Sequence, residues 1–440
     1  MNIKKFFEKA AAAGITSCQL RVSSSTSTSI SLFHHEIDSY SIENDQSLVA
    51  TGVYQGKVGI CNTQKIDNSS FDFLIQGIIN NASKSEKTDS VDIFPGSPKY
   101  KKKSFFAKEL AETPITEKID LIKEIENDLF AYSDEISDVQ GVSYSESSST
   151  GALYNSYGLK LKAKDNYFFI SAGVVAKRGD EVKTAGDYEF GTDIKAIDKK
   201  AFVNGICERA IKQFGGVQCP AGKYPTLLDR DVFGSLLSYF LAANSADEVQ
   251  RKSSFLAGLE GKRVASNKVT IDEKPLLKGP LYTYYDAEGV ARSNKRVVNH
   301  GILLTHFYNR ETAKKAGRET TANGSYGAGK IGIGTTNIIV KPSKLPLESL
   351  IKDIKEGVYI TEVAGLGTGM NVNSGDFGCQ AQGYMIRDGK IAEPLDLITL
   401  AGNVLKMLRN VKGFDDRFRL QIGVSCSDAL IKEMSIGGKN

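Results

Sequence analysis

Several residue types and patterns are scarce or absent in this 440-residue chain. Tryptophan is missing, which indicates no function by itself, and only four histidines are present. No uninterrupted apolar span reaches the roughly 18 residues that a membrane-crossing helix needs, so we expect no membrane partner. The net charge is only +4, and the short basic run at residues 99–103 is typical of a solvated linker. A nucleic-acid partner is therefore not expected.

The cysteines are few and scattered, and no CxxC pair occurs. They are Cys18, Cys61, Cys207, Cys219, Cys379 and Cys426. This arrangement argues against a disulfide framework or a zinc ribbon and favours reduced thiols in the cytoplasm. Residues 1–16 superficially resemble a signal peptide, but Glu8 interrupts the apolar run. The spacing of Ile3, Phe6 and Ala10 predicts an amphipathic helix instead.

The composition that is present is ordinary for a folded protein, with 25% charged and 41% hydrophobic residues. The length predicts two or three domains. We expect a mixed α/β N-terminal domain over residues 1–135, in which residues 83–104 form an exposed loop or linker. Residues 136–440 show the alternation of antiparallel strands, with helices near 199–243 and 395–408. The predicted fold class is α+β, with a large, barrel-like C-terminal body of mostly antiparallel strands.

The glycine-rich stretch from Ala364 to Asn403 is the most informative part of the chain. A glycine-rich turn runs into Ser-Gly-Asp-Phe at residues 374–377, and an alternating strand follows. Asp388 and Gly389 then give a hairpin signal. So many glycines beside an extended strand indicate backbone that lies close to other backbone, such as that of a bound peptide.

The segment from Gly324 to Lys330 has the GxxxxGK spacing of a phosphate-binding loop. However, Ile331 follows where a Ser or Thr would hold magnesium. Residues 331–340 are rich in strand-forming residues, whereas a phosphate-binding loop leads into a helix. We therefore interpret the segment as a loop that enters a strand.

The histidines offer little metal chemistry, because none stands in HExxH and no two have helical ligand spacing. They are His34, His35, His300 and His306. Cys379 could act as a nucleophile with His300 or His306, although nothing in the sequence brings them together. An active hydrolase that uses these three residues is one alternative hypothesis.

Several short motifs along the chain together resemble the TldD/PmbA family, and the resemblance covers nearly the whole sequence. They are Leu48–Gly59 (LVATGVYQGKVG), Val264–Ser266 with residues 269–272, Asp286–Val290 (DAEGV), Thr305–Gly324, the turn at residues 365–377, Asp388–Lys390, Pro394 and Ala401–Asn403. Each motif is weak alone, but their combination in this order is specific.

The resemblance implies a zinc site in the protease branch of this family, built by an HExxxH helix and a cysteine near the C-terminus. The corresponding helix places Leu237 and Ala242 at the two histidine positions and Ser238 at the glutamate position. Leucine and alanine cannot bind zinc, and serine is a poor general base. Cys426 comes later than the family's ligand cysteine. No catalytic or metal-binding residue is therefore expected in this chain.

These departures resemble the PmbA, or TldE-like, branch. The resemblance implies a catalytically silent subunit that pairs with a zinc-bearing TldD-like homologue, or with itself as a dimer, in the proteolysis of unfolded peptides. Zinc would be bound only by that partner. The family is linked to maturation of a peptide antibiotic and to turnover of an antitoxin, which explains its older description as a modulator of DNA gyrase.

The resemblance also makes Ser374, Gly375, Asp376 and Phe377 candidates for a surface that faces the peptide. A tight turn with no contact to a peptide is the alternative. Another alternative is a non-enzymatic interaction protein that acts on a gyrase inhibitor or in an antitoxin pathway.

Overall fold

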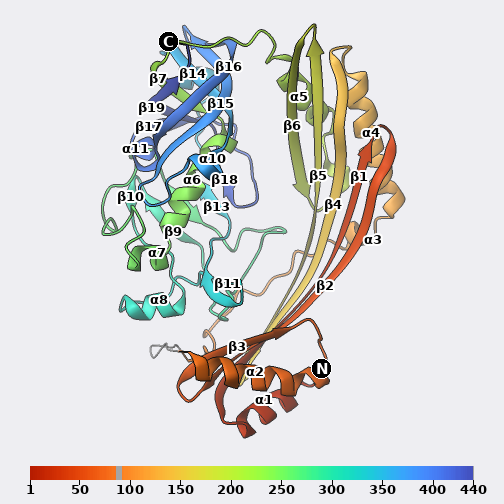
Figure 1. Cartoon of the computed structure of the whole chain (residues 1–440), viewed down its shortest axis with the longest axis vertical. Helices are drawn as coiled ribbons and strands as arrows, with labels where there is room; N and C mark the ends of the chain where they lie inside the picture. Colours follow the sequence, from red (N-terminus) through yellow and green to blue (C-terminus); the bar gives the residue numbers. More distant parts are fainter. Residues whose placement is uncertain (86–91, 440) are drawn as a thin grey trace. The chain divides into compact units, whose positions relative to one another are not determined.

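The computed structural model describes residues 1–85 and 92–439, which form two compact units (Figure 1). Unit 1 contains residues 1–211, 276–292 and 309–332, and unit 2 contains the remaining segments, 212–275, 293–308 and 333 onward. The boundary expected after residue 135 lies inside unit 1, at the start of a long strand.

Unit 1 is built on a six-stranded antiparallel sheet with the strand order β3-β2-β1-β4-β5-β6. The strands are β1 (Ile15–Phe33), β2 (Glu36–Tyr54), β3 (Lys57–Thr63), β4 (Ile136–Asn155), β5 (Lys160–Arg178) and β6 (Glu181–Gly191). Strand β3 pairs with residues 48–54 of β2 only. In the described part of the chain, residues 36–47 of β2 therefore have β1 as their only partner strand.

Helices cover one face of this sheet, because alternate strand residues are apolar and need burial. These helices are α1 (Ile3–Ala12), η1 (Asn68–Ser70), α2 (Phe71–Lys84), α3 (Lys108–Glu112), α4 (Ile115–Ala131), η2 (Ile194–Ala196) and α5 (Lys199–Ile211). Three further elements come later in the chain, namely helix α8 (Arg310–Lys315) and strands β11 (Gly324–Gly327) and β12 (Lys330–Ile333). The amphipathic helix predicted at the N-terminus is confirmed, with Phe6 and Ala10 fully buried. Gly324 to Lys330 forms a hairpin, so a strand follows it as expected.

The loop expected over residues 83–104 is described only in part, because residues 86–91 lie outside the described residues. Residues 92–104 contain no helix or strand. They are nevertheless held in unit 1, since Ile93 is buried and the Tyr100 hydroxyl donates to the Gly289 carbonyl at 2.7 Å. Residues 92–104 therefore form a loop that contacts unit 1, and most of residues 98–104 are exposed.

Unit 2 contains a closed barrel of five strands, in which β7 pairs with β14, β14 with β15, β15 with β16, β16 with β19 and β19 with β7. The strands are β7 (Gly222–Leu228), β14 (Glu356–Ala364), β15 (Asp376–Arg387), β16 (Lys390–Asn403) and β19 (Ala429–Gly437), with β17 (Val411–Phe414) added beside β19. All pairings except β7 with β14 are antiparallel. The predicted α+β fold class with a barrel-like C-terminal body is confirmed.

The Asp388–Gly389 hairpin is confirmed, since both residues adopt the left-handed conformation that a tight hairpin turn needs. The helix predicted over residues 395–408 is wrong for most of its length. Strand β16 continues to Asn403, and only α11 (Val404–Arg409) is helical. A bulge in β16 places Leu395 and Ile398 opposite Gly383 and Ala381, and this extra spacing mimics the period of a helix.

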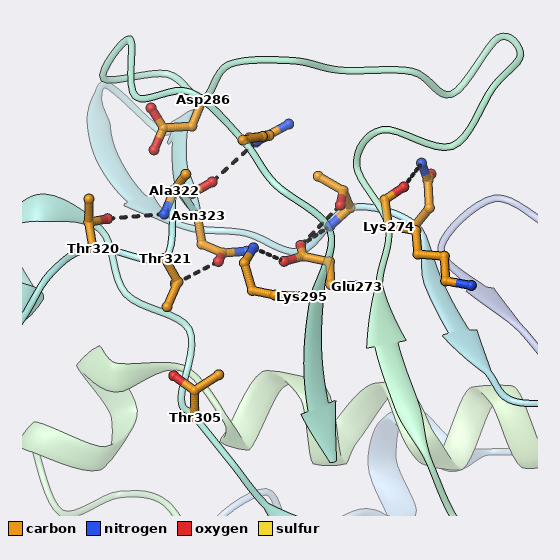
Figure 2. Close-up of polar contacts among 12 residues, drawn as sticks. Glu273, Lys274, Asp286, Lys295, Thr305, Thr320, Thr321, Ala322 and Asn323 are labelled. Carbon is orange, nitrogen blue, oxygen red and sulfur yellow. Dashed lines mark hydrogen bonds and ion pairs between the residues drawn. The ribbon is translucent and has the colours of Figure 1, made fainter. Parts of the chain in front are cut away.

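A second sheet in unit 2 has the order β10-β9-β8-β13-β18. It consists of β8 (Ile271–Glu273), β9 (Lys295–Asn299), β10 (Ile302–Leu303), β13 (Ile338–Val340) and β18 (Val424–Ser425). Figure 2 shows the ion pair that joins two of its strands, in which Lys295 donates to the fully buried Glu273 at 2.5 Å. Thr336 satisfies the other carboxylate oxygen of Glu273 through its backbone and hydroxyl.

The remaining helices of unit 2 are α6 (Arg230–Ala243), α7 (Ala246–Gln250), α9 (Leu347–Ile351) and α10 (Leu366–Gly369). The helices predicted near residues 199–243 are α5 and α6, with strand β7 between them. Within the described ranges, no helix is both long and apolar enough to cross a membrane.

The close packing of α2 on β3 gives a test of the unit 1 core. A Cβ atom on Gly59 would overlap the carbonyl oxygen of Ile78 and lie 2.9 Å from the Ala82 nitrogen. We expect Gly59→Ala to lower the free energy of unfolding by about 1 to 3 kcal/mol and to reduce Tm in circular dichroism. Gly205→Ala is the control, since its Cβ would meet no atom within 4 Å in α5. The packing account is wrong if both variants melt alike.

Candidate functional site

Helix α6 packs its apolar side into the core of unit 2. Its N-terminus is fixed by Asp229, which accepts a hydrogen bond from the Asp231 backbone and donates its own N–H to the Ile360 carbonyl at 2.9 Å. Several α6 side chains are buried, namely Val232, Phe233, Leu236, Leu237, Phe240 and Leu241. The helix is therefore rigidly placed with respect to the barrel.

A cavity of about 700 Å³ lies against the C-terminal half of α6. From the helix it is lined by Ser238, Tyr239, Leu241, Ala242 and Ala243. The structure thus brings Ser238 and Ala242 to the same cavity, whereas Leu237 is buried in the core. The Ser238 hydroxyl donates to the Gly234 carbonyl at 3.0 Å, so it is engaged by its own helix.

The residues of this wall do not fit a zinc ion. Zinc in proteins is held by imidazole, thiolate or carboxylate groups, and no α6 residue on the cavity carries one. Moving the alignment by one residue, to 238, 239 and 243, changes nothing, because serine, tyrosine and alanine stand there. Across residues 1–85 and 92–439, no three His, Cys, Asp or Glu side chains are arranged to hold a metal.

Cys426 packs against the same helix but acts as a buried thiol. Its Sγ donates to the Arg230 carbonyl at 3.2 Å, and a Cβ on Gly234 would lie 3.7 Å from it. Burial raises the pKa of the Cys426 thiol well above its ordinary value, and nearby carboxylates raise it further. The side chain therefore stays neutral, which disfavours metal binding.

A buried polar network anchors the start of α6 to the barrel. The Tyr359 hydroxyl donates to Asp428 at 2.7 Å and also lies 3.2 Å from Asp229. Arg417 pairs with Asp428 and, at 2.5 Å, with Asp415. Burial, followed by the neighbouring Asp229, raises the pKa of Asp428 to about 7. These residues come from distant parts of the sequence, so no local sequence pattern predicts the network.

The residues of the hydrolase alternative have separate surroundings. His306 is buried and its Nδ1 lies 2.7 Å from the Asn244 side-chain oxygen. His300 is exposed, with its Nδ1 3.1 Å from a backbone carbonyl. Cys379 is buried between barrel strands, where burial raises the pKa of its thiol to about 11. The Cys379 Sγ lies 3.6 Å from the Leu400 carbonyl oxygen, and a neutral thiol in this position is poorly suited to nucleophilic attack.

The four candidates for a peptide-facing surface form a tight turn. Gly375 has φ +75°, and Phe377 is buried. The Ser374 hydroxyl donates to Asp376 at 2.7 Å, and the Asn403 amide donates to Asp376 at 2.9 Å. These hydrogen bonds hold the pKa of Asp376 below its ordinary value. Only Ser374, in part, and Asp376 remain accessible to a ligand.

The loop that leads into this turn reaches the α6 cavity. Val372 lies two residues before Ser374, lines the cavity and is 59% exposed. The glycine-rich stretch and the α6 helix, 130 residues apart in the chain, thus border the same cavity through Val372 and Ala242 (372 − 242 = 130).

Two protein-family models together match most of the chain. A family model for the PmbA/TldA metallopeptidase central domain matches residues 108–214. A second, for the PmbA/TldA metallopeptidase C-terminal domain, matches residues 221–438. The chain therefore contains domains of a metallopeptidase-related protein. The chain belongs to the PmbA/TldD family.

Individual relatives are similar over nearly their full length. Metalloprotease PmbA of Escherichia coli O157:H7 is 24% identical over 428 residues, which cover 96% of this chain and 92% of that protein. A Thermotoga maritima crystal structure that bears the name of a DNA gyrase modulator has a TM-score of 0.91 at 26% identity, with 99% of both chains covered. TldE from Thermococcus kodakarensis shares the fold, with a TM-score of 0.89, 20% identity and coverage of 99% and 100%.

The raised pKa of Asp428 predicts a pH dependence of stability. Because folding raises this pKa to about 7, the folded chain holds the proton more tightly than the unfolded chain. The resulting stabilisation is complete below the ordinary Asp pKa and is lost as the pH rises towards 7. Asp428→Asn should remove this titration and reduce the loss of stability between pH 5 and pH 7 by about 2 kcal/mol.

Urea unfolding at pH 5, 6 and 7, followed by circular dichroism, measures this difference. Asp376→Asn is the control, since the pKa of Asp376 is lowered and its ionisation does not change in this range. An unchanged pH slope in Asp428→Asn would contradict the assignment.

Proposed function

We propose that this chain is a non-catalytic, PmbA/TldE-like subunit of a TldD-type zinc metalloprotease system that cleaves unfolded peptides. One observation carries the proposal. In a family described as metallopeptidases, the α6 wall of the cavity offers Ser238, Tyr239 and Ala242 in place of metal ligands. Hydrolysis would then belong to a zinc-bearing homologue, with self-pairing as the other arrangement.

The α6 cavity suits a role in holding the peptide. Its volume of about 700 Å³ is within the range of pockets that enclose ligands of drug size. Its walls combine small residues, among them Gly334 and Gly423, with apolar side chains such as Phe307 and with the acidic residues Asp247 and Glu248. A mixed wall of this kind can contact both the backbone and the side chains of an extended chain. Val372 offers an apolar contact at the rim.

The turn at residues 374–377 would position Val372 and present Asp376 to the peptide. Its internal hydrogen bonds support a rigid platform, which lowers the entropy lost on binding. We place the system in the cytoplasm, a setting that the six unpaired cysteines support.

The first test concerns the chain alone and with a partner. Purified alone, it should bind zinc only in substoichiometric amounts by mass spectrometry and should not cleave an unfolded peptide. Mixed with a zinc-bearing family member, it should raise peptide cleavage, and a chelator should abolish that activity. The zinc-bearing member alone is the matched control. Chelator-sensitive cleavage by this chain alone would falsify the proposal.

The second test concerns the cavity rim. Val372→Asp places a charge at the apolar contact and should weaken partner-dependent cleavage of an unfolded peptide about tenfold, mainly through KM. Val217→Asp is the matched control, because Val217 is exposed but does not line this cavity. Equal activity of the two variants would remove Val372 and its loop from the peptide-binding surface.

A further inference from the structure

The face of the unit 1 sheet opposite to α4 is lined by serine hydroxyls. Directly opposite residues in antiparallel strands point to the same face. The β1–β4 register places four serine pairs in a row, and β2 adds two more partners. The pairs are Ser25–Ser149, Ser27–Ser147, Ser29–Ser145 and Ser31–Ser143, with Ser41 opposite Ser29 and Ser39 opposite Ser31. These side chains are at least partly accessible.

Aromatic rings continue this face onto the neighbouring strands. Phe169 of β5 lies opposite Ser145, and Phe190 of β6 lies opposite Phe169. The Phe169 ring contacts those of Tyr188 and Phe190, with centroids 6.0 Å and 5.9 Å apart. The face thus combines small hydrogen-bonding groups with half-buried rings, which suits an extended chain of mixed side chains.

A cavity of about 370 Å³ opens at one end of the serine rows. Arg21, Ser23 and Ser25 project into it from alternate positions of β1, and Ser149 joins them from β4. Residues 283–292 and 324–326 form the other walls. All of these residues belong to unit 1.

Arg21 is the unusual group in this cavity. Its Nη1 is buried and has no hydrogen-bond acceptor among the described residues. The guanidinium lies over the Tyr326 ring, 5.8 Å from its centroid, which helps to fix its direction. A buried donor without an acceptor is unfavourable, because it has lost its hydrogen bonds to water. Such a donor needs a hydrogen-bond acceptor that the described residues do not supply.

Three acidic residues line the cavity, namely Asp45, Asp165 and Asp286, and the last two accept hydrogen bonds from the chain itself. Asp286 accepts hydrogen bonds from three backbone N–H groups, those of Glu288, Val290 and Gly324. Burial raises the pKa of Asp286, so its negative charge is disfavoured. Asp165 accepts from the Ser149 hydroxyl at 2.6 Å, and burial raises its pKa as well. The carboxyl groups of Asp286 and Asp165 therefore oppose an incoming anion only weakly, and Asp45, opposite Ser25 on β2, is exposed to solvent.

A second guanidinium adds positive potential to the same wall. Arg292 donates to the Ala322 carbonyl at 3.2 Å and to the Thr283 hydroxyl at 2.9 Å. Asp286, which lines this cavity, and Ala322 are both labelled in Figure 2. The cavity therefore combines two guanidinium groups with hydroxyl donors, an arrangement that matches a carboxylate.

We propose that this cavity binds the C-terminal carboxylate of an unfolded peptide, with Arg21 as its principal ligand. The inference rests on the proposed function and specifies how the peptide is recognised. The carboxylate supplies the acceptor that Arg21 lacks. The serine rows continue from the cavity along β1 and β4, so the rest of the peptide can exchange hydrogen bonds with hydroxyls that read little sequence. A small free carboxylate has the same head group but makes no hydrogen bonds to the serine rows.

The test is fluorescence anisotropy of the full chain with a short unstructured peptide, labelled at its N-terminus. One form carries a free C-terminal carboxylate, and the other carries a C-terminal amide. The free acid should bind about tenfold more tightly than the amide, since a charge-assisted contact is lost in the amide. Arg21→Met should abolish this difference, whereas Arg296→Met, which removes a charge from unit 2, should preserve it.

A second variant covers the case in which Arg21→Met fails to fold. Tyr326→Leu removes the ring beneath the guanidinium and should reduce the preference for the free acid several-fold. The proposal is overturned if the wild-type chain binds both peptides equally or binds neither, or if folded Arg21→Met or Tyr326→Leu retains the full preference. Competition by acetate at the concentration of the peptide would assign the cavity to small carboxylates instead. This measurement involves neither a partner subunit nor peptide cleavage. A negative result would therefore reject the carboxylate site without deciding the outcome of the zinc and cleavage assays.

Discussion

The packing of α6 against the closed barrel is the constraint on which the rest of unit 2 depends. The helix buries one side in the core, so its opposite side must face the cavity. The Asp229–Tyr359–Asp428 network fixes where the helix starts and therefore which of its residues reach the cavity. A buried network of this kind is unfavourable unless every member is satisfied, so its geometry tolerates little change.

This constraint separates the scaffold from the chemistry. The buried side of the helix is enough to hold its place in the fold, so the residues on its exposed side are not fixed by core packing. Ser238 and Ala242 are small residues of that exposed side, and both line the cavity. The space beside the helix therefore does not depend on which chemical groups line it.

Local patterns in the sequence predicted much of the fold. The buried residues of α1, the Asp388–Gly389 turn and the antiparallel strands follow from spacing and turn chemistry. The helix prediction over residues 395–408 was wrong because the β16 bulge gives Leu395 and Ile398 a helical spacing. The position of Leu237 was also beyond prediction, because the packing partners of α6 decide which side is buried.

The polar sites were harder to foresee than the fold. Asp229, Tyr359, Arg417 and Asp428 are adjacent only because the barrel closes, and the closing pairs join distant strands. The strand register is needed to pair the serines of β1 with those of β4. Side-chain burial is needed to identify the Arg21 nitrogen that has no hydrogen-bond partner among the described residues.

The open edge of β2 has a consequence for how the chain avoids unwanted association. Residues 36–47 leave backbone groups available on that edge, which is a common template for aggregation. Glu36, Asp38, Glu43 and Asp45 all lie along it. Two copies that met edge to edge would bring like charges close together at both ends of the contact. Electrostatic repulsion therefore disfavours pairing of this edge with a second copy, a role that a covering strand would otherwise have.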